Sequence, residues 1–583
     1  MKNRRKRGGL NGGDVVLVTW RRFFRFVALF VFSFVLFSAL FIFLGNKTIN
    51  HKAVLGGSVP AVKVVTIHEA VEFPDQTLIF LNYPPASRLL TKEDLFCVFS
   101  DVNDSSKLFK ELPFAVETDD SGRQIVRCSA MPRGNTVSLA VSRWTVGNNK
   151  DLLVGTTHRW DWLVYDAVID DDNSTVVFVK GLNLRPGKVA DVSRYECVYG
   201  WDFTKPKLLL RAQVISAAQE IVRCKTPLTV LEGPRTAQSQ PVRVSVRIKG
   251  SEMLPSVAQP IKRPGRVKDS KPFETCVCTM TRNAANVLRE WVMYHGKIGV
   301  QRWFIYDNNS DDDIVSEIKN LENRGYNVSR HFWPWIKTQE AGFANCAIRA
   351  KRDCDWVAFI DVDEFFYIPS GQTLTDVIRN HTIAPSSSTG DEIGEIRTPC
   401  HSFGPSGLRD RPREGVTAAY TCRMVLPERH KSIIRPESLN ATLINVVHHF
   451  HLRDGFTFAD VDKGTMVINH YKYQVWDVFK EKFKRRVATY VADWQNEENV
   501  GSKDRAPGLG TRPVEPSDWA ERFCEVRDTG LQGWVLENFR DRKTQRLVWE
   551  REGRRVEDDV IVQMGSWADK RVGRKRKKQL KAQ

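Results

Sequence analysis

Three signatures that identify common nucleotide and metal sites are absent from this 583-residue chain. It has no Gly-x-Gly-x-x-Gly, which argues against a dinucleotide-binding fingerprint, and no Gly-x-x-x-x-Gly-Lys-Ser/Thr, which argues against a P-loop. It also has no Cys-x-x-Cys pair, so neither a zinc ribbon nor a thioredoxin-like redox motif is supported. A nucleotide, if one binds, must therefore be held in another way.

The middle of the chain lacks a large excess of charge of either sign. The net charge is +18, but residues 1–25 contribute +7 and residues 570–583 contribute +8, which leaves +3 for everything between. Nucleic-acid recognition needs basic residues spread over a folded face, so we exclude nucleic acid as a partner. We interpret the Arg574–Lys578 run as a solvated tail that is attracted to acidic glycans or lipid headgroups.

One apolar run, Phe26–Leu44, has the length of a membrane-spanning helix. At about 1.5 Å per residue its nineteen residues reach roughly 28 Å, which matches a bilayer core. The basic residues before it predict a cytosolic tail (1–25) and a lumenal remainder, so the chain is expected to be a type II protein of the Golgi membrane. A cleaved signal peptide is the alternative.

Asn-x-Ser/Thr sequons occur only beyond this segment, in agreement with a lumenal chain. The glycosylation candidates are Asn46, Asn103, Asn173, Asn327, Asn380 and Asn440. Asn308 also begins a sequon, but it lies in a candidate site. Eleven cysteines in an oxidising compartment predict several disulfides and at least one unpaired thiol.

A short stem (45–60) leads to a β-rich region (61–258) of short apolar runs separated by turn residues. A weak repeat runs through this region, and it predicts two β units with disulfides Cys97–Cys128 and Cys197–Cys224. A single β-sandwich is the alternative.

A linker (259–272) precedes an alternating α/β region (273–500), which is followed by a C-terminal extension with a basic tail (501–583). Strands are expected at 275–281, 302–306, 327–333 and 356–360, with helices between them at 284–296, 310–321 and 341–352. This alternation predicts a parallel sheet that binds its ligand at the carboxyl ends of the strands.

The most informative motif is Asp361-Val-Asp363, because it directly follows the unbroken apolar run Trp356–Ile360. Asp-x-Asp by itself is common in this chain: it recurs at 170/172, 311/313, 353/355 and 460/462. Only the 361/363 pair follows a buried-strand pattern. Two carboxylates at the mouth of an α/β sheet are able to hold Mn²⁺ or Mg²⁺ and, through it, a diphosphate. A haloacid-dehalogenase-type phosphotransferase is rejected, because Glu364-Phe365 replaces the Gly-Thr/Val that such a site requires.

Several stretches together resemble glycosyltransferase family 92, and the strand–Asp-x-Asp arrangement resembles a GT-A fold. These stretches are Cys278–Asn283, Glu290–His295, Phe403–Gly407, Lys431–Pro436 and Asn469–Tyr471. The architecture of anchor, all-β carbohydrate-binding-like module and GT-A domain is similar to that of the plant β-1,4-galactan synthases. The resemblance implies an inverting enzyme that moves galactose from UDP-galactose to β-1,4-galactan side chains of pectin, with a homodimer as the expected assembly.

The resemblance also implies roles for individual residues. Nucleotide-sugar contacts are assigned to Thr281, Arg282, Asp307, Asn345 and Asp361. The metal ligands would be Asp361, Asp363 and His470, with His449 and His451 as alternatives to the histidine. Asp410 and Glu414 are the candidate catalytic bases, with Glu364 as a further possibility.

Two alternatives remain open at this stage. One is a family 92 transferase with another donor or acceptor, and the other is a non-catalytic Golgi lectin or scaffold. Trp333, Trp335, Trp476 and Trp494 are candidates either for stacking on sugars or for core packing.

Overall fold

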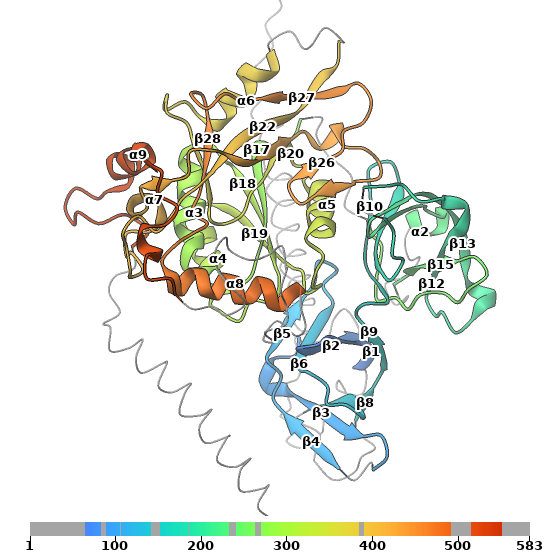
Figure 1. The fold of residues 1–583 in the computed structure, drawn as a ribbon. Helices are drawn as coiled ribbons and strands as arrows, with labels where there is room; N and C mark the ends of the chain where they lie inside the picture. The colour runs from blue at the N-terminus through green and yellow to red at the C-terminus, as the bar shows by residue number, and fades with distance from the viewer. Residues whose placement is uncertain are drawn as a thin grey trace, which may run out of the picture. The chain divides into compact units, whose positions relative to one another are not determined.

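Strands fill the first half of the described chain, and alternating strands and helices follow (Figure 1). The computed structural model describes residues 65–82, 89–104, 107–141, 152–185, 187–232, 241–262, 270–383, 390–490 and 515–550. The predicted cytosolic tail, anchor, stem and basic C-terminal tail lie outside these ranges. Within the ranges that are described, no helix is long and apolar enough to cross a membrane.

The first β unit consists of two sheets. Its strands are β1 (Thr66–Glu72), β2 (Gln76–Asn82), β3 (Leu95–Asp101), β4 (Leu108–Glu111), β5 (Ala115–Thr118), β6 (Gln124–Ser129), β7 (Asn135–Val141), β8 (Leu153–Val154) and β9 (Thr156–Arg159). One sheet has the order β5-β6-β2-β1-β9 and the other β4-β3-β7-β8. Cys97 in β3 and Cys128 in β6 form the predicted disulfide, which joins the two sheets.

The second β unit is one seven-stranded sheet with the order β15-β12-β13-β14-β11-β10-β16. Its elements are β10 (Leu163–Ile169), β11 (Ser174–Lys180), β12 (Tyr195–Gly200), β13 (Leu210–Ala218), β14 (Ile221–Lys225), the short helix α2 (Leu228–Leu231), β15 (Arg243–Ile248) and β16 (Ile261–Lys262). Cys197 and Cys224 form the second predicted disulfide.

The sequence repeat corresponds to a repeat in strand register. Thr77 lies opposite Cys128 across β2 and β6, and Thr175 lies opposite Cys224 across β11 and β14. Because the same residues pair in the same way in two separate sets of sheets, the structure favours two β units over a single sandwich.

The α/β region contains a nine-stranded sheet whose first half is parallel, as predicted. Strands β17 (Phe273–Thr281), β18 (Arg302–Asp307), β19 (Asn327–Phe332) and β20 (Cys354–Phe359) have the order β19-β18-β17-β20. All three pairings among them are parallel. The connecting helices are α3 (Ala285–Lys297), α4 (Ile314–Asn323) and α5 (Gln339–Ala350). Each helix buries one apolar face, for example Leu288, Trp291 and Val292 of α3.

The second half of the sheet, β24-β22-β28-β21, begins with antiparallel pairing to β20. Its strands are β21 (Glu364–Tyr367), β22 (Glu392–Ser402), β24 (Glu428–Ile434) and β28 (Val467–His470), and β27 (Phe456–Asp460) pairs with β22. The remaining elements are α6 (Leu374–Ile383), α7 (Val416–Ala419), β23 (Cys422–Arg423), β25 (Asn445–Val446), β26 (His449–Phe450), α8 (Trp476–Tyr490), β29 (Val526–Arg527) and α9 (Gly530–Phe539).

Two further disulfides lie within the α/β region. Cys276 bonds to Cys354 and Cys278 to Cys346, so these two cysteines of β17 have separate partners. Cys400 is buried and unpaired, as the odd cysteine count requires.

The described part of the predicted C-terminal extension packs into the α/β core. Leu531 and Val535 of α9 and Trp549 belong to the same buried cluster as helix α3. Cys524 is bonded to Cys422, and β29 pairs with β23. The expected boundary at residue 500 therefore does not end the packing unit.

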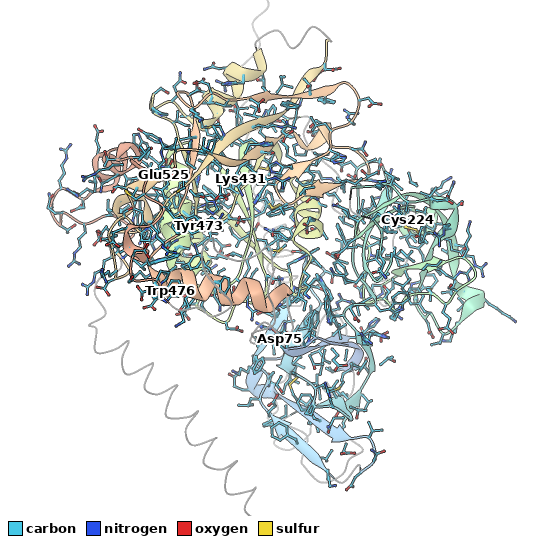
Figure 2. All side chains as sticks on the ribbon, viewed as in Figure 1. Asp75, Cys224, Lys431, Tyr473, Trp476 and Glu525 are labelled. Atoms are coloured by element: carbon cyan, nitrogen blue, oxygen red, sulfur yellow. A yellow bond between two sulfur atoms is a disulfide. The ribbon has the colours of Figure 1, made fainter. Side chains whose placement is uncertain are left out.

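The large aromatic residues proposed for stacking are mostly buried. Trp333 and Trp335 pack against Phe80 and Tyr165 of the β units, with 5.0 Å between the ring centroids of Tyr165 and Trp335. Trp476 packs on Trp519 in a buried cluster that also contains Tyr473. Trp476 and Tyr473 are labelled in Figure 2. These three tryptophans contribute to packing, and Trp494 lies outside the described residues.

Candidate active site

The two acids stand where strand β20 leaves the sheet. Ile360 is fully buried after β20, and Asp361 and Asp363 follow in the turn that leads into β21. Their side chains keep 32% and 17% of their surface exposed. The buried run fixes the end of the strand, and the turn leaves both carboxylates accessible from solvent.

His448 faces Asp361 from the β25–β26 hairpin. Its Nε2 lies 3.4 Å from Asp361 Oδ2, and its Nδ1 is 2.9 Å from the carbonyl oxygen of Phe359. An imidazole that donates its Nδ1 proton to this carbonyl turns its Nε2 toward Asp361. A backbone carbonyl that fixes the ring through its other nitrogen is typical of metal-binding histidines.

Asp363 is flanked by two basic groups. Lys482 of α8 donates from Nζ to Asp363 Oδ2 at 2.7 Å, and His470 Nε2 lies 3.6 Å from the same oxygen. His470 is the last residue of β28, which pairs with β21 so that His470 lies opposite Glu364. Strand pairing therefore brings the predicted histidine to the second acid.

Glu364 is fully buried beneath the two aspartates. Lys431 Nζ lies 2.6 Å from Glu364 Oε1 and 3.9 Å from Asp361 Oδ2 (Figure 2 labels Lys431). Glu364 Oε2 also accepts the backbone N–H of Asp361 at 3.0 Å. Glu364 therefore holds Lys431 and the backbone of Asp361 in place. Because it has no exposed surface, its location does not support a role as the catalytic base.

Opposite charges dominate the titration of these groups. Burial raises the pKa of Asp361, but attraction to His448 and Lys431 outweighs it and lowers that pKa to about 2. Burial likewise opposes ionisation of Asp363, yet Lys482 and His470 hold its pKa well below the usual range. For His470, burial lowers the pKa, and the stronger effect of Asp363 and Glu364 raises it well above the usual value.

The residues present fit a divalent cation. Asp361, Glu364 and His448 each offer a ligand atom within 4.8 Å of the others, and Asp363 and His470 lie directly beside them. Carboxylate oxygens with one imidazole suit Mn²⁺. Glu364 is engaged by Lys431, so Asp361, Asp363 and a histidine are the available ligands.

The predicted nucleotide-sugar residues are distributed over two places. Thr281 lies opposite Asp307 at the ends of β17 and β18. Asp307 is fully buried, and its carboxylate accepts hydrogen bonds from Arg330 Nε at 2.7 Å and from the backbone N–H of Ser310 at 2.9 Å. Arg282 pairs with Asp311 at 3.6 Å. The contacts of Asp307 are those of a structural residue.

Asn345 lies on α5, away from the acids. Its Oδ1 accepts from Tyr306 Oη at 2.7 Å, and its Nδ2 donates to Asp166 of the second β unit at 3.0 Å. The structure therefore does not bring Asn345 to Asp361, because its amide is used to join two parts of the chain.

Several other candidates are apart from the acids. Asp410 and Glu414 lie on an exposed segment between β22 and α7. His451 is exposed, and His449 is directed to Ser432 and His430 on the other side of β24. Of the histidines near 448–451, only His448 contacts an acid of the Asp-x-Asp motif.

Four of the sequon asparagines are exposed in the structure: Asn103, Asn173, Asn327 and Asn380. Asn440 is half-buried, and Asn46 lies outside the described residues. Asn308 donates from Nδ2 to the carbonyl oxygens of Trp333 and Trp335, which agrees with its omission from the glycosylation candidates.

Sequence reasoning missed His448, Lys431 and Lys482. Lys431 did carry a signal, because it begins the Lys431–Pro436 stretch. His448 is one of three histidines in His448-His-Phe-His451, and no local pattern distinguishes them. Lys482 lies among several lysines of α8 and carries no signal at all.

Comparison with known proteins shows which family of enzymes the chain resembles. Residues 271–502 match the model of glycosyltransferase family 92. A family 92 protein of Ricinus communis is 52% identical over 577 residues, which cover 94% of this chain and 100% of that protein. A second, from Oryza sativa subsp. japonica, is 52% identical over 83% of this chain and 82% of its own length.

The chain is thus a glycosyltransferase, and it belongs to glycosyltransferase family 92. An Arabidopsis thaliana member is 46% identical over 84% of this chain and 85% of its own. Among solved structures, S. aureus TarS 1–349 matches with a TM-score of 0.22 and 12% identity, over 38% of this chain and 66% of that chain. A likeness at that level supports no argument about this protein.

Proposed function

We propose that this protein is a metal-dependent, inverting galactosyltransferase of the GT-A type, which extends β-1,4-galactan with galactose from UDP-galactose. The observation that carries the proposal is the group formed by Asp361, Asp363, His448 and His470 at the carboxyl end of β20. A lectin that had lost turnover would have no need to keep two ionised acids between two imidazoles and two lysines.

The ligands of the ion would be Asp361, Asp363 and one of the two histidines. When bound, Mn²⁺ or Mg²⁺ would supply charge neutralisation for the diphosphate leaving group. Lys482 and Lys431 each place a positive charge at the same acids, where they are able to attract the diphosphate. Their attraction also keeps both aspartates ionised at neutral pH.

An inverting transfer needs a carboxylate that removes the proton of the acceptor hydroxyl as it attacks the anomeric carbon. The candidates are Asp410 and Glu414, which are exposed and therefore accessible to a polymer but lie apart from Asp361 and Asp363. The galactose donor and the galactan acceptor are proposed from the resemblance of the motifs to those of the galactan synthases. A single hydroxyl of a sugar is recognised through contacts with the bound substrate.

The test is transfer by the full-length protein in detergent, with UDP-galactose, Mn²⁺ and labelled galacto-oligosaccharides. Chain extension that is lost in EDTA and in Asp361→Asn/Asp363→Asn would support the proposal. Consumption of another nucleotide sugar would keep the metal-dependent mechanism and replace the donor. Binding of galactan without turnover of any donor would favour the lectin and contradict the proposal.

The proposal includes a single-pass type II location in the Golgi membrane, with the catalytic part in the lumen. It is supported by the apolar segment 26–44 and by four exposed sequon asparagines. Removal of N-glycans from protein made in plant cells should reduce its apparent mass. An unchanged mass, or exposure of the catalytic part to protease in intact vesicles, would contradict this topology.

A further inference from the structure

A second group of metal-binding side chains lies on the opposite side of β24 from the acids. Glu395 of β22, His430 of β24 and His449 of β26 each offer a ligand atom within 4.8 Å of the others. We propose that these three residues form a zinc site, which is separate from the site at Asp361 and Asp363 and independent of the transfer reaction.

Strand alternation explains how two sites form so close together. Successive side chains of a strand point to opposite faces, so Lys431 reaches Glu364 while His430 and Ser432 face the other way. The dipeptide His448-His449 is divided in the same manner: His448 faces Asp361, and His449 Nδ1 lies 3.3 Å from Ser432 Oγ.

Glu395 supplies a buried carboxylate with one oxygen directed to the histidines. Its Oε2 is held by Arg397 at 3.0 Å, while its Oε1 accepts from Ser432 Oγ at 2.5 Å and lies 3.9 Å from His430 Nε2. Glu395 is fully buried, so its negative charge must be compensated by nearby positive charge. Arg397 at Oε2 supplies this compensation only in part.

His430 provides the most direct indication of a ligand. Its Nε2 is buried and has no hydrogen-bond partner among the described residues. The ring centroids of His430 and His449 are 4.2 Å apart, so both imidazoles converge on the same space beside Glu395. A buried polar atom without a partner is costly, and a bound cation would satisfy it.

The donor set favours zinc over the hard cations. Two imidazoles and one carboxylate suit Zn²⁺, whereas Mg²⁺ and Ca²⁺ prefer oxygen ligands. Zinc bonds of about 2.0 Å place tetrahedral ligands about 3.3 Å apart, so ligand atoms that lie within 4.8 Å of one another need to approach by at most about 1.5 Å. A water molecule would complete the tetrahedron.

The experiment must distinguish the proposed zinc site from a second group of possible zinc ligands. Glu364, Cys400 and His470 also lie within reach of a single ion, but this group includes a thiol. Zinc bound there would have a sulfur ligand at about 2.3 Å, whereas the proposed site has nitrogen and oxygen ligands only. X-ray absorption spectroscopy of the zinc-loaded protein distinguishes the two directly.

The experiment uses full-length Asp361→Asn/Asp363→Asn protein, in which the acid site is disabled, after chelator treatment and loading with Zn²⁺ alone. We expect one zinc per chain with nitrogen and oxygen ligands only. Adding His430→Gln or Glu395→Gln should weaken zinc binding at least about 10-fold. His381→Gln, which changes a half-buried histidine of α6, is the matched control and should not alter binding.

A sulfur ligand in the absorption spectrum would overturn the proposal, as would zinc affinity that is unchanged by both His430→Gln and Glu395→Gln. The melting temperature of each variant without metal shows whether it folds. If a variant does not fold, the spectrum of the unmutated site decides, because it needs no substitution at the proposed ligands.

Discussion

The two halves of the nine-stranded sheet contribute to the candidate active site in different ways. The parallel half delivers Asp361 and Asp363 through one strand, β20, whose apolar run is continuous in the sequence. The other half, β24-β22-β28-β21, has mixed parallel and antiparallel pairing and delivers Lys431 and His470 from strands that are far apart along the chain, and the adjoining hairpin delivers His448. The acids are therefore a local feature of sequence, whereas the basic groups around them result from long-range pairing.

The difference also separates the roles of the two halves. Acids at the end of a parallel strand are what a divalent cation requires. Lys431 and His470 of the mixed half, with His448 of the hairpin and Lys482 of α8, keep these acids ionised, so the acids depend on the other elements for a working site. Substitutions in either half test this dependence.

The largest effect is expected from the parallel half. Asp361→Asn or Asp363→Asn should reduce transfer by about 10³-fold, because the loss of a metal ligand removes several kcal/mol of charge stabilisation from the transition state. The measurement is the initial rate of chain extension at saturating Mn²⁺. Asp355→Asn, an exposed acid at the opposite end of the same strand, is the control and should stay within about twofold of the unmutated rate. Equal losses in both variants would contradict the assignment.

Lys431→Met tests the mixed half of the sheet through stability. This change removes the nearest cation from the fully buried Glu364, whose other basic neighbour is His470 at 3.7 Å, and it should lower the free energy of unfolding by about 3 kcal/mol. The double variant Lys431→Met/Glu364→Gln, which also removes the buried carboxylate charge, should recover most of the loss. Thermal unfolding of the three proteins checks the prediction, and a double variant no more stable than Lys431→Met would argue against it.

His448→Gln should lower the rate of transfer by about 10- to 100-fold, the usual cost of disturbing a ligand or its support at a metal site. Higher Mn²⁺ concentrations should restore part of the rate. His451→Gln lies in the same His448–His451 motif but is exposed, so it should have little effect. If His451→Gln is the more damaging change, the hairpin does not present His448 to Asp361 as described.

The smallest effect concerns the contact of the parallel half with the second β unit. Burial raises the pKa of Asp170, but Lys351 and Arg223 lower it below its usual value. The unfolded chain thus binds a proton more readily, so this stabilisation is complete above about pH 4 and is lost as the pH falls through the folded-state pKa. Asp170→Asn removes this titration and should make the acid limb of the stability curve shallower. Identical acid limbs would contradict the prediction.

Much of the fold could be predicted because its signals are local. The alternation of apolar strands and amphipathic helices between 275 and 360 corresponds to β17, α3, β18, α4, β19, α5 and β20. The repeated Ile-Val-Arg-Cys stretches gave two disulfides correctly, since each stretch forms the same strand pairing. The packing of residues 515–550 was not foreseen, because α9 carries no mark of the distant helix α7 that it contacts.

The amino-acid sequence by itself determined the family, the parallel half of the sheet and the two acids, because a buried strand and the turn after it are encoded in consecutive residues. Only the tertiary structure decided which histidine faces which acid, that Lys431 and Lys482 flank them, and that His430 and His449 converge on Glu395. Those choices depend on register between strands that are separated by tens of residues. A shift of one residue in that register would exchange the faces to which Lys431 and His430 point.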